Sequence, residues 1–358
     1  MTRIRSNPAS VRFEAVTKVY PGSTAPAVDA ISFAIEPGTL VTLLGPSGCG
    51  KTTTLRLIAG LELATGGRIL IGDAEVTRLP ATDRDVSMVF QSYALFPHMT
   101  VVENVSYGLR FSGFDKREIA ARAAEGLALV GLTGFEARLP SELSGGQQQR
   151  VAVARALVLE PQVLLFDEPL SNLDARLRRR VRDEIREIQQ KLGLTVVYVT
   201  HDQEEALAVS DRIIVMDRAV IAQEGSPRAL YDAPNTAFVA DFIGESNVMR
   251  CEITSVVAST AEVRVGPVNL TLPARGLAPG PALLSVRPRH LAIVGDGRPN
   301  TLAGTVAKVT YAGSHAELAL ETEIGTIFLI TSDASSLPVA ETAVQVDIPA
   351  SAAVLLLG

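Results

Sequence analysis

The sequence predicts an α/β domain with a helical insertion, followed by a smaller all-β domain. The first observation is an apolar run of strand length, Leu40–Leu44, which leads through a glycine-rich loop into a helical segment. The second is a change of character after Asn247, where short alternating stretches are separated by glycine and proline, as in small barrels. Because 358 residues suffice for two hydrophobic cores, we expect domains at 1–242 and 243–358.

The loop after the first strand matches the phosphate-binding pattern G-x-x-x-x-G-K-[ST]. Its residues are Gly45, Pro46, Ser47, Gly48, Cys49, Gly50, Lys51 and Thr52, and Thr53 opens the helix behind them. The glycines let backbone amides surround a polyphosphate, and the helix start adds partial positive charge. Lys51 suits the β and γ phosphates, and the Thr52 hydroxyl suits Mg²⁺. We therefore expect a P-loop NTPase core. Cys49 fills a free position of the loop, and we expect it to be a packing residue rather than a redox-sensitive thiol.

The segment between the sheet strands reads as a helical subdomain, at about 92–158. Apolar residues recur at helical spacing at Ile119, Ala123, Leu127 and Val130. The subdomain ends in a serine and two glycines before a long helix, so that Ser144 is a good N-cap with little side-chain cover over the first amides. The residues of this second helix start are Ser144, Gly145, Gly146 and Gln147, and they form a second anion-ready site.

Two acids end a continuous apolar run at 163–168, which is typical of a buried parallel strand. Ligands bind at the carboxyl edge of such sheets. We expect Asp167 to hold Mg²⁺ and Glu168 to orient or deprotonate the attacking water, although both acids could simply cap the next turn before Pro169. His201 follows the next strand, at 195–199, and is a candidate γ-phosphate sensor or proton partner.

Charge and composition exclude several functional classes. The net charge of −6 does not favour nucleic acid. The arginine-rich helix after Asp174 is interleaved with acids, so we expect a solvated, ion-paired face. Cys49 and Cys251 suggest no disulfide framework. No apolar run reaches the length of a signal peptide core or of a membrane span, so we expect a cytoplasmic chain that reaches a membrane only through a partner.

The second domain offers little for nucleic acid. From Glu245 onward there are seven Lys and Arg residues against ten Asp and Glu, and the only aromatic residues are Tyr311 and Phe328. A single-strand-binding barrel needs a basic groove and stacking aromatics. We expect an OB-like barrel, or a pair of barrels, with a structural, regulatory or small-ligand role.

These motifs together resemble those of the ATP-binding cassette (ABC) ATPases, over nearly the whole chain. Leu143-Ser144-Gly145-Gly146-Gln147 is similar to the family's signature motif. The resemblance implies ATP and Mg²⁺ as cofactors and an active ATPase. The implied roles are adenine stacking for Tyr20, contact with Mg²⁺ and the attacking water for Gln91, catalytic base for Glu168, coupling of two sites for Asp174 and switch histidine for His201.

A narrower resemblance is to bacterial importer ATPases with a C-terminal regulatory (TOBE) domain, carried by residues 91–100, 171–177 and the β-rich region after Glu245. It implies a homodimer in which the second helix start of one copy closes over the phosphate-binding loop of the other. Permease subunits in the membrane would dock near Gln91 to Met99, although this apolar stretch could equally be ordinary packing of the subdomain. A periplasmic solute-binding protein would complete the complex at the cytoplasmic face of the inner membrane. Polyamine, ferric iron or organophosphonate is favoured as cargo over sugar.

One departure and two alternatives accompany this resemblance. Many members carry Val-Arg-Pro-Glu where this chain has Val-Arg-Pro-Arg ending at Arg289, which puts any role of that glutamate in doubt. A soluble ABC ATPase acting on ribosomes or DNA is disfavoured, because the chain has one phosphate-binding loop and no heptad run. A C-terminal barrel that senses a ligand is compatible with the importer.

Overall fold

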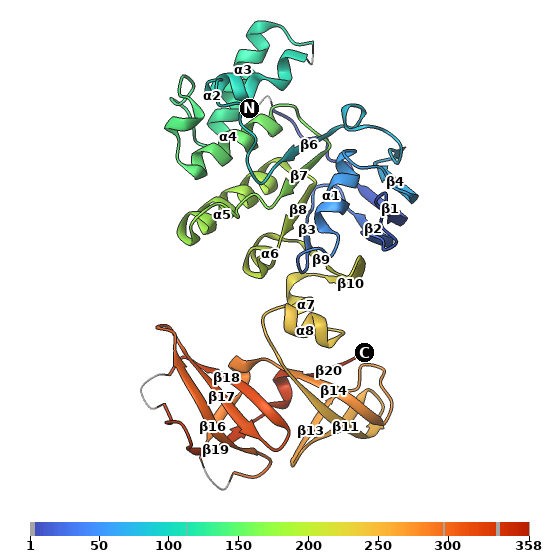
Figure 1. The fold of residues 1–358 in the computed structure, drawn as a ribbon, viewed down its shortest axis with the longest axis vertical. Coiled ribbons are helices and arrows are strands. Elements are labelled where there is room, and N and C mark those ends of the chain that lie inside the picture. The colour runs from blue at the N-terminus through green and yellow to red at the C-terminus, as the bar shows by residue number, and fades with distance from the viewer. Residues whose placement is uncertain (1–3, 112, 296–297, 334–336, 358) are drawn as a thin grey trace. The chain divides into compact units, whose positions relative to one another are not determined.

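The computed structural model describes residues 4–111, 113–295, 298–333 and 337–357, and its contacts divide the chain into two units, Met1–Pro227 and Arg228–Gly358 (Figure 1). The sequence placed this division at 242/243. The observed division is earlier because α8 (Ala237–Phe242) packs on the strands that follow it, and Tyr231 of α7 (Pro227–Asp232) contacts Arg287.

The first unit is built on a six-stranded sheet of order β10-β9-β3-β8-β7-β6. Its strands are β3 (Leu40–Leu44), β6 (Val86–Val89), β7 (Val163–Asp167), β8 (Val196–Thr200), β9 (Arg212–Asp217) and β10 (Val220–Gly225). All are parallel except β10, which pairs antiparallel with β9 as the expected hairpin. Every residue of β3 and β8 is buried, which explains their largely apolar sequences. Three helices follow strands of this sheet along the chain: α1 (Lys51–Ala59), α5 (Ala175–Leu192) and α6 (Gln203–Val209).

A second, antiparallel sheet of order β2-β1-β4-β5 lies in the same unit. Its strands are β1 (Val11–Lys18), β2 (Val28–Ile35), β4 (Gly66–Ile71) and β5 (Ala74–Glu75). Buried residues alternate along β1 and include Phe13, whose ring stacks on Phe33 at 4.5 Å between centroids. The buried faces of this sheet share a core with α1, so the sheet supports the helix that follows the phosphate-binding loop.

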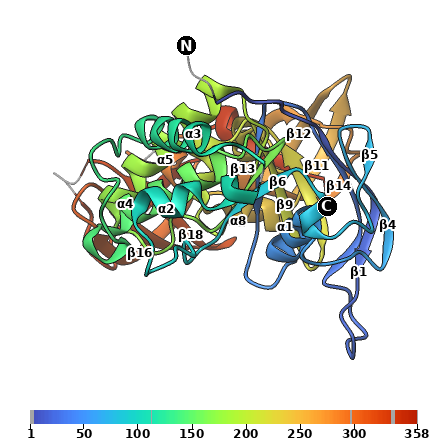
Figure 2. The same ribbon diagram turned by 90° about the horizontal axis from the view of Figure 1, so that it is seen from above.

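The helical subdomain is inserted between β6 and β7, as expected. It contains α2 (Val101–Ser106), α3 (Lys116–Leu129) and α4 (Gly145–Leu157), which lie side by side (Figures 1 and 2). Its short 3-10 turns are Gly108–Phe111 and Pro140–Glu142. α4 begins at Gly145, directly after Ser144, which caps it as the sequence predicts, and both glycines are helical.

The second unit contains two five-stranded antiparallel sheets, of orders β13-β12-β11-β14-β20 and β15-β19-β16-β17-β18. The strands are β11 (Asn247–Val257), β12 (Thr260–Val265), β13 (Val268–Pro273), β14 (Gly280–Val286), β15 (Ala292–Val294), β16 (Leu302–Tyr311), β17 (Ala316–Thr322), β18 (Gly325–Thr331), β19 (Ala343–Asp347) and β20 (Ala353–Leu356). The all-β expectation is confirmed. One hydrophobic core joins the inner faces of both sheets.

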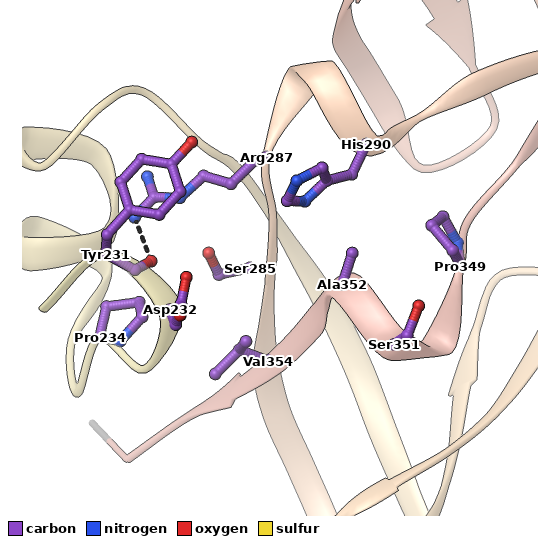
Figure 3. A pocket seen from close by; sticks show the side chains of 10 residues that line it. All are labelled: Tyr231, Asp232, Pro234, Ser285, Arg287, His290, Pro349, Ser351, Ala352 and Val354. Carbon is purple, nitrogen blue, oxygen red and sulfur yellow. Dashed lines mark hydrogen bonds between the residues drawn. The ribbon is translucent and has the colours of Figure 1, made fainter. Parts of the chain in front are cut away.

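Two arginines tie α7 and α8 to this unit. Arg287 is buried, stacks on Tyr231 at 4.4 Å and donates to the Tyr231 carbonyl (Figure 3). It also donates to the carbonyls of Ala240 and Glu245. Arg275 donates to backbone carbonyls around Pro234 and to that of Leu355. Cations suit helix C-termini, where carbonyls lack intrahelical partners. The two helices are therefore hydrogen-bonded into the β domain.

A pocket of about 480 Å³ opens beside Arg287 in the second unit, at the end of α7 (Figure 3). Its polar lining includes Ser285, Ser351, Asp232 and His290. Arg289, two residues after Arg287, is exposed.

Among the described residues, no helix combines the length and the apolar character that crossing a bilayer requires.

Candidate functional site

The phosphate-binding loop (residues 45–52) connects buried β3 to α1. Gly48 and Gly50 have φ angles of 80° and 107°, which disfavour any other residue. A Cβ on Gly50 would also lie 2.5 Å from the carbonyl oxygen of Ala27. Ser47 and Gly48 form the exposed tip of the loop. The backbone is therefore shaped as the pattern requires, with its tip open to a ligand.

Lys51 lies inside this loop. Its side chain is only 6% exposed, and its Nζ donates to the carbonyl oxygens of Gly45 and Pro46 at 2.7 and 2.8 Å. Gly50 caps α1 without any side-chain hydrogen bond, so no side chain of the cap covers the first amides of the helix. The site thus combines a centred positive charge with uncovered backbone donors, which is what a polyphosphate needs.

Cys49 is buried, at 4% exposure, and burial raises the pKa of its thiol despite the neighbouring Lys51 ammonium. A thiol held protonated is a poor nucleophile. Its position against Gly45 agrees with the packing role expected from the sequence.

Thr52 and Asp167 are brought together at the carboxyl edge of the sheet. The Thr52 hydroxyl donates to Asp167 Oδ1 at 3.4 Å across the gap between α1 and β7. Burial raises the pKa of Asp167, partly countered by Arg56 and by the Thr52 hydrogen bond, and Glu168 adds to the rise. A desolvated carboxylate beside a hydroxyl is a set of oxygen donors that fits a hard cation such as Mg²⁺. Among the described residues, no three or more His, Cys, Asp or Glu side chains are grouped so that they could hold a metal ion by themselves.

Gln91, the third expected metal contact, is engaged elsewhere. Its Nε2 donates to the Ser171 hydroxyl at 3.1 Å, and its backbone carbonyl oxygen accepts from Asn172 Nδ2 at 2.9 Å. The structure therefore joins Gln91 to the Asp174 loop (residues 168–174) rather than to Thr52 or Asp167.

Glu168 and His201 form a pair above the end of β7. His201 Nδ1 lies 3.1 Å from Glu168 Oε2, although the two residues are 33 positions apart. Glu168 has a φ of 45°, a costly conformation for a residue with a side chain. This conformation is held by a hydrogen bond from the Glu168 backbone amide to the Val199 carbonyl oxygen, at 3.0 Å, and by the Ser171 hydroxyl, which donates to the Glu168 backbone carbonyl. The carboxylate points at His201 and does not cap the next turn, which argues against the purely structural interpretation.

The second helix start is well capped and lies in the helical subdomain. Ser144 and Gln147 form a capping box, in which the Ser144 amide donates to Gln147 Oε1 at 2.9 Å. A Cβ on Gly146 would approach Leu177 Cδ1 to 2.9 Å, and one on Gly145 would lie 3.2 Å from Leu173. These glycines therefore allow α4 to pack closely against the Asp174 loop and the start of α5. α4 lies with α2 and α3, while α1 lies beside the sheet strands (Figure 1).

Asp174 and Tyr20 have defined places. Asp174 is exposed and caps α5 by accepting from the Leu177 amide at 3.0 Å. Tyr20 is half-buried, with its hydroxyl 3.4 Å from the Thr53 hydroxyl and its ring 4.9 Å from Lys18 Nζ. Tyr20 thus lies against the first turn of α1, close to the phosphate-binding loop.

The stretch from Gln91 to Met99 differs from the expected docking wall in one respect. Tyr93 is 5% exposed and belongs to the core of the subdomain, so it cannot face a partner. Phe96 instead begins a row of aromatic rings: Tyr107 lies 4.6 Å from Phe96, and Phe111 lies 5.4 Å from Tyr107. Phe111 is 76% exposed.

Sequence reasoning missed a partly buried polar cluster next to His201. Its members are Arg178, Tyr198, Thr200, Asp202 and Glu205, which are joined by hydrogen bonds and ion pairs. The sequence signal for this cluster was Glu205, four residues after His201, which follows the polar side chains of Tyr198 and Thr200 in an otherwise apolar strand.

The match to known families covers both units. Residues 28–171 match the family described as "ABC transporter", and residues 284–356 match the family described as "TOBE domain". Proteins named "Fe(3+) ions import ATP-binding protein FbpC" from Brucella abortus (strain 2308) and from Rhizobium etli are 63% and 62% identical to this chain. The first alignment covers 92% of both chains, and the second covers 91% of this chain and 92% of the relative.

Solved structures resemble the first unit. The ATP-binding cassette MJ0796, in a dimeric post-hydrolysis state bound to ADP and Pi, is 33% identical, with a TM-score of 0.54 over 61% of this chain and 99% of that chain. The protein cbiO1 from Clostridium perfringens, part of the ABC transporter complex cbiONQ, is 28% identical, with a TM-score of 0.58 over 62% of this chain and 89% of that chain. Sequence, fold and site geometry agree that the chain belongs to the ABC transporter family and is an ATP-binding, ATP-hydrolysing member of it.

Proposed function

We propose that this protein is the ATP-hydrolysing subunit of a bacterial importer for ferric iron. The pairing of Glu168 with His201, beside Thr52 and Asp167 and the phosphate-binding loop, carries the hydrolytic part of this proposal. The names of relatives that are about three-fifths identical support the cargo, which was among the three that the sequence favoured.

The residues divide the chemistry among themselves. Lys51 exchanges its two carbonyl acceptors for phosphate oxygens, and the amides of the loop surround the triphosphate. Thr52 and Asp167 would hold Mg²⁺, which supplies positive charge against the phosphates when bound, and Gln91 would approach it through movement of its side chain. Tyr20 stacks on the adenine. The hydrogen bonds to Val199, Ser171 and His201 hold Glu168 where its carboxylate can deprotonate a water that attacks the γ-phosphate.

His201 supports that step in two ways. A hydrogen bond from its Nδ1 orients the Glu168 carboxylate, and its 60%-exposed side chain is free to reach a phosphate oxygen. Deprotonation of the water by Glu168 and charge stabilisation by Lys51 together account for phosphoryl transfer to water.

The complete site needs a second copy of the chain. Residues Ser144 to Gln147 of one subunit would close over the nucleotide held by the other, so a two-fold dimer would contain two sites. Asp174 would lie at the contact between the copies. At low concentration, where most of the protein is monomeric, the rate of ATP hydrolysis should then rise with the square of protein concentration.

Permease subunits in the membrane would dock on the helical subdomain. The row formed by Phe96, Tyr107 and Phe111 offers aromatic anchors of the kind enriched at the centre of interfaces. The chain would therefore lie at the cytoplasmic face of the inner membrane, and a periplasmic solute-binding protein would deliver the cargo from the other side.

Substitution of Glu168 by glutamine tests the catalytic assignment. We expect vanadate-sensitive ATP hydrolysis to fall by at least about 100-fold, because the amide cannot accept the proton. ATP-dependent dimerisation, measured by size-exclusion chromatography with light scattering, should persist. Hydrolysis by the variant at the wild-type rate would refute the role of Glu168.

The cargo is tested in the complex reconstituted with its permease and solute-binding protein. Ferric iron should stimulate hydrolysis, whereas spermidine, an organophosphonate and maltose should not. Stimulation by one of the other solutes instead would overturn the cargo. Recovery of the protein with ribosomes or DNA rather than with membranes would overturn the transport role.

A further inference from the structure

Arg178 of α5 contacts two loops that belong to different parts of the proposed site. Its Nη2 donates to the carbonyl oxygen of Leu173, at 3.1 Å, in the Asp174 loop. Its Nη1 donates to Asp202 Oδ2 at 3.1 Å, immediately after His201. Its Nε lies 3.6 Å from Glu205 Oε1. One guanidinium therefore connects the segment before Asp174 with the segment that carries His201.

The segment that carries His201 is fixed on its inner side by Glu205. This side chain is buried and accepts from the Thr200 hydroxyl at 2.8 Å and from the Tyr198 hydroxyl at 3.2 Å. Asp202 accepts from the Glu205 amide at 3.1 Å and so caps α6. Thr200 and Asp202 flank His201 on both sides. Arg178 contacts Asp202 directly, and it also contacts Glu205, which accepts from the Thr200 hydroxyl.

We expect this cluster to contribute little to the free energy of unfolding, but its geometry suits the transmission of movement between the two loops. The Arg178 side chain is one-third exposed and Asp202 about one-quarter exposed, so solvent weakens their attraction. A planar guanidinium that donates to Leu173 and Asp202 in fixed directions, with an ion pair to Glu205, nevertheless resists any relative shift of the loops that it joins.

We propose that Arg178 is a positioning residue that couples the Asp174 loop to the contact between His201 and Glu168. This inference rests on the proposed function, in which Asp174 meets the second subunit. When that subunit presses on the Asp174 loop, Leu173 moves, and Arg178 carries the displacement to Asp202 and hence to His201. The γ-phosphate contact is thereby completed only in the closed dimer.

The first experiment compares Arg178→Ala with Arg180→Ala in the full-length protein. Arg180 lies on the same helix, is exposed and, among the described residues, forms its ion pair with Glu184, so it is a matched control. We expect Arg178→Ala to lower kcat for ATP about tenfold with KM changed less than about twofold, because nucleotide binding by the phosphate-binding loop is untouched. Arg180→Ala should leave both values at the wild-type level.

A double-mutant cycle tests the connection itself. Asp202→Asn removes the charge but keeps a good helix cap. If both residues act through one contact, Arg178→Ala combined with Asp202→Asn should reduce kcat no further than the stronger single variant. Arg178→Lys should restore only part of the rate, because the single nitrogen of an ammonium cannot reproduce the two separate Nη donors that contact Leu173 and Asp202.

Two outcomes overturn the proposal: a kcat for Arg178→Ala equal to that of Arg180→Ala, or multiplicative losses in the double variant. If Arg178→Ala does not fold, the same comparison is made with Arg178→Lys and Glu205→Gln. Wild-type and Glu168→Gln proteins in the same assay separate this inference from the proposed function. An inactive wild type refutes the proposed function, whereas normal rates in Arg178→Ala beside an active wild type refute only the coupling.

Discussion

The two helix starts that could face a nucleotide differ in how their backbone amides are used. α1 begins at Gly50, which has no side-chain cap, and Lys51 is folded back on the loop. α4 begins at Ser144, whose capping box with Gln147 satisfies two amides within the helix. The first start therefore leaves donors uncovered for a ligand and carries its own full charge.

This difference indicates a division of labour. α1 has what is needed to bind a nucleotide alone, whereas α4 is a pre-shaped surface without a charged side chain in its first turn. Its two glycines are held close to Leu173 and Leu177. We infer that α4 contributes to turnover through a nucleotide held elsewhere, and that its shape depends on α5. The predictions below test this division.

The largest expected effect is loss of ATP affinity in Lys51→Ala. Removing the ammonium loses charge-assisted hydrogen bonds to phosphate, about 3 kcal/mol or roughly 100-fold in Kd. Isothermal titration with ATP measures this loss. Ser144→Ala in the same experiment should bind ATP like the wild type, and an equal loss in both variants would mean that the two helix starts act alike.

The next effect is expected at Gly146. A valine would place branched atoms against Leu177, whose Cδ1 lies 2.9 Å from an ideal Cβ, and should cost about 1–3 kcal/mol of unfolding free energy. Denaturant unfolding measures that cost, with Gly146→Ala as a milder comparison. Hydrolysis should fall while ATP binding persists. A normal hydrolysis rate in a folded Gly146→Val protein would contradict the place of α4 in the site.

Ser144→Ala should have a smaller effect on stability. Loss of an N-cap costs about 1 kcal/mol, which corresponds to a decrease in Tm of roughly 2–4 °C for a unit of this size. Differential scanning calorimetry would detect it. Ser144→Asp preserves the cap and should restore Tm. However, it adds a negative charge towards the partner's nucleotide, so hydrolysis should remain low.

The smallest effect is expected at Cys49. Burial raises the pKa of this thiol, so at a given pH less thiolate is present than in the unfolded chain. In a Cys251→Ser background, iodoacetamide at pH 8 should modify the folded protein at least about tenfold more slowly than the urea-unfolded protein. Cys49→Ala should leave ATP affinity within about twofold of the wild type. Rapid modification of folded protein would indicate a reactive thiol instead.

Local sequence pattern was sufficient to predict features whose residue types are dictated by their immediate neighbours. The phosphate-binding loop, the cap at Ser144 and the acids at the end of β7 could be predicted from spacing alone. The division between units did not, because it depends on Arg287 and on where its acceptors lie. The pairing of Gln91 with Ser171 and the burial of Tyr93 were also missed, since both depend on contacts between segments far apart in sequence.

The arrangement around Arg287 has a practical consequence for dissecting the protein. A fragment that starts at Glu245 would lack Tyr231, which stacks on Arg287, and the carbonyls of Tyr231 and Ala240, and would expose the face of the β domain against which α8 packs. A fragment that starts at Arg228 retains all three acceptors and both short helices. Ligand screening of the isolated C-terminal region should therefore begin at residue 228, and a failure of the shorter fragment would reflect misfolding rather than an absence of binding.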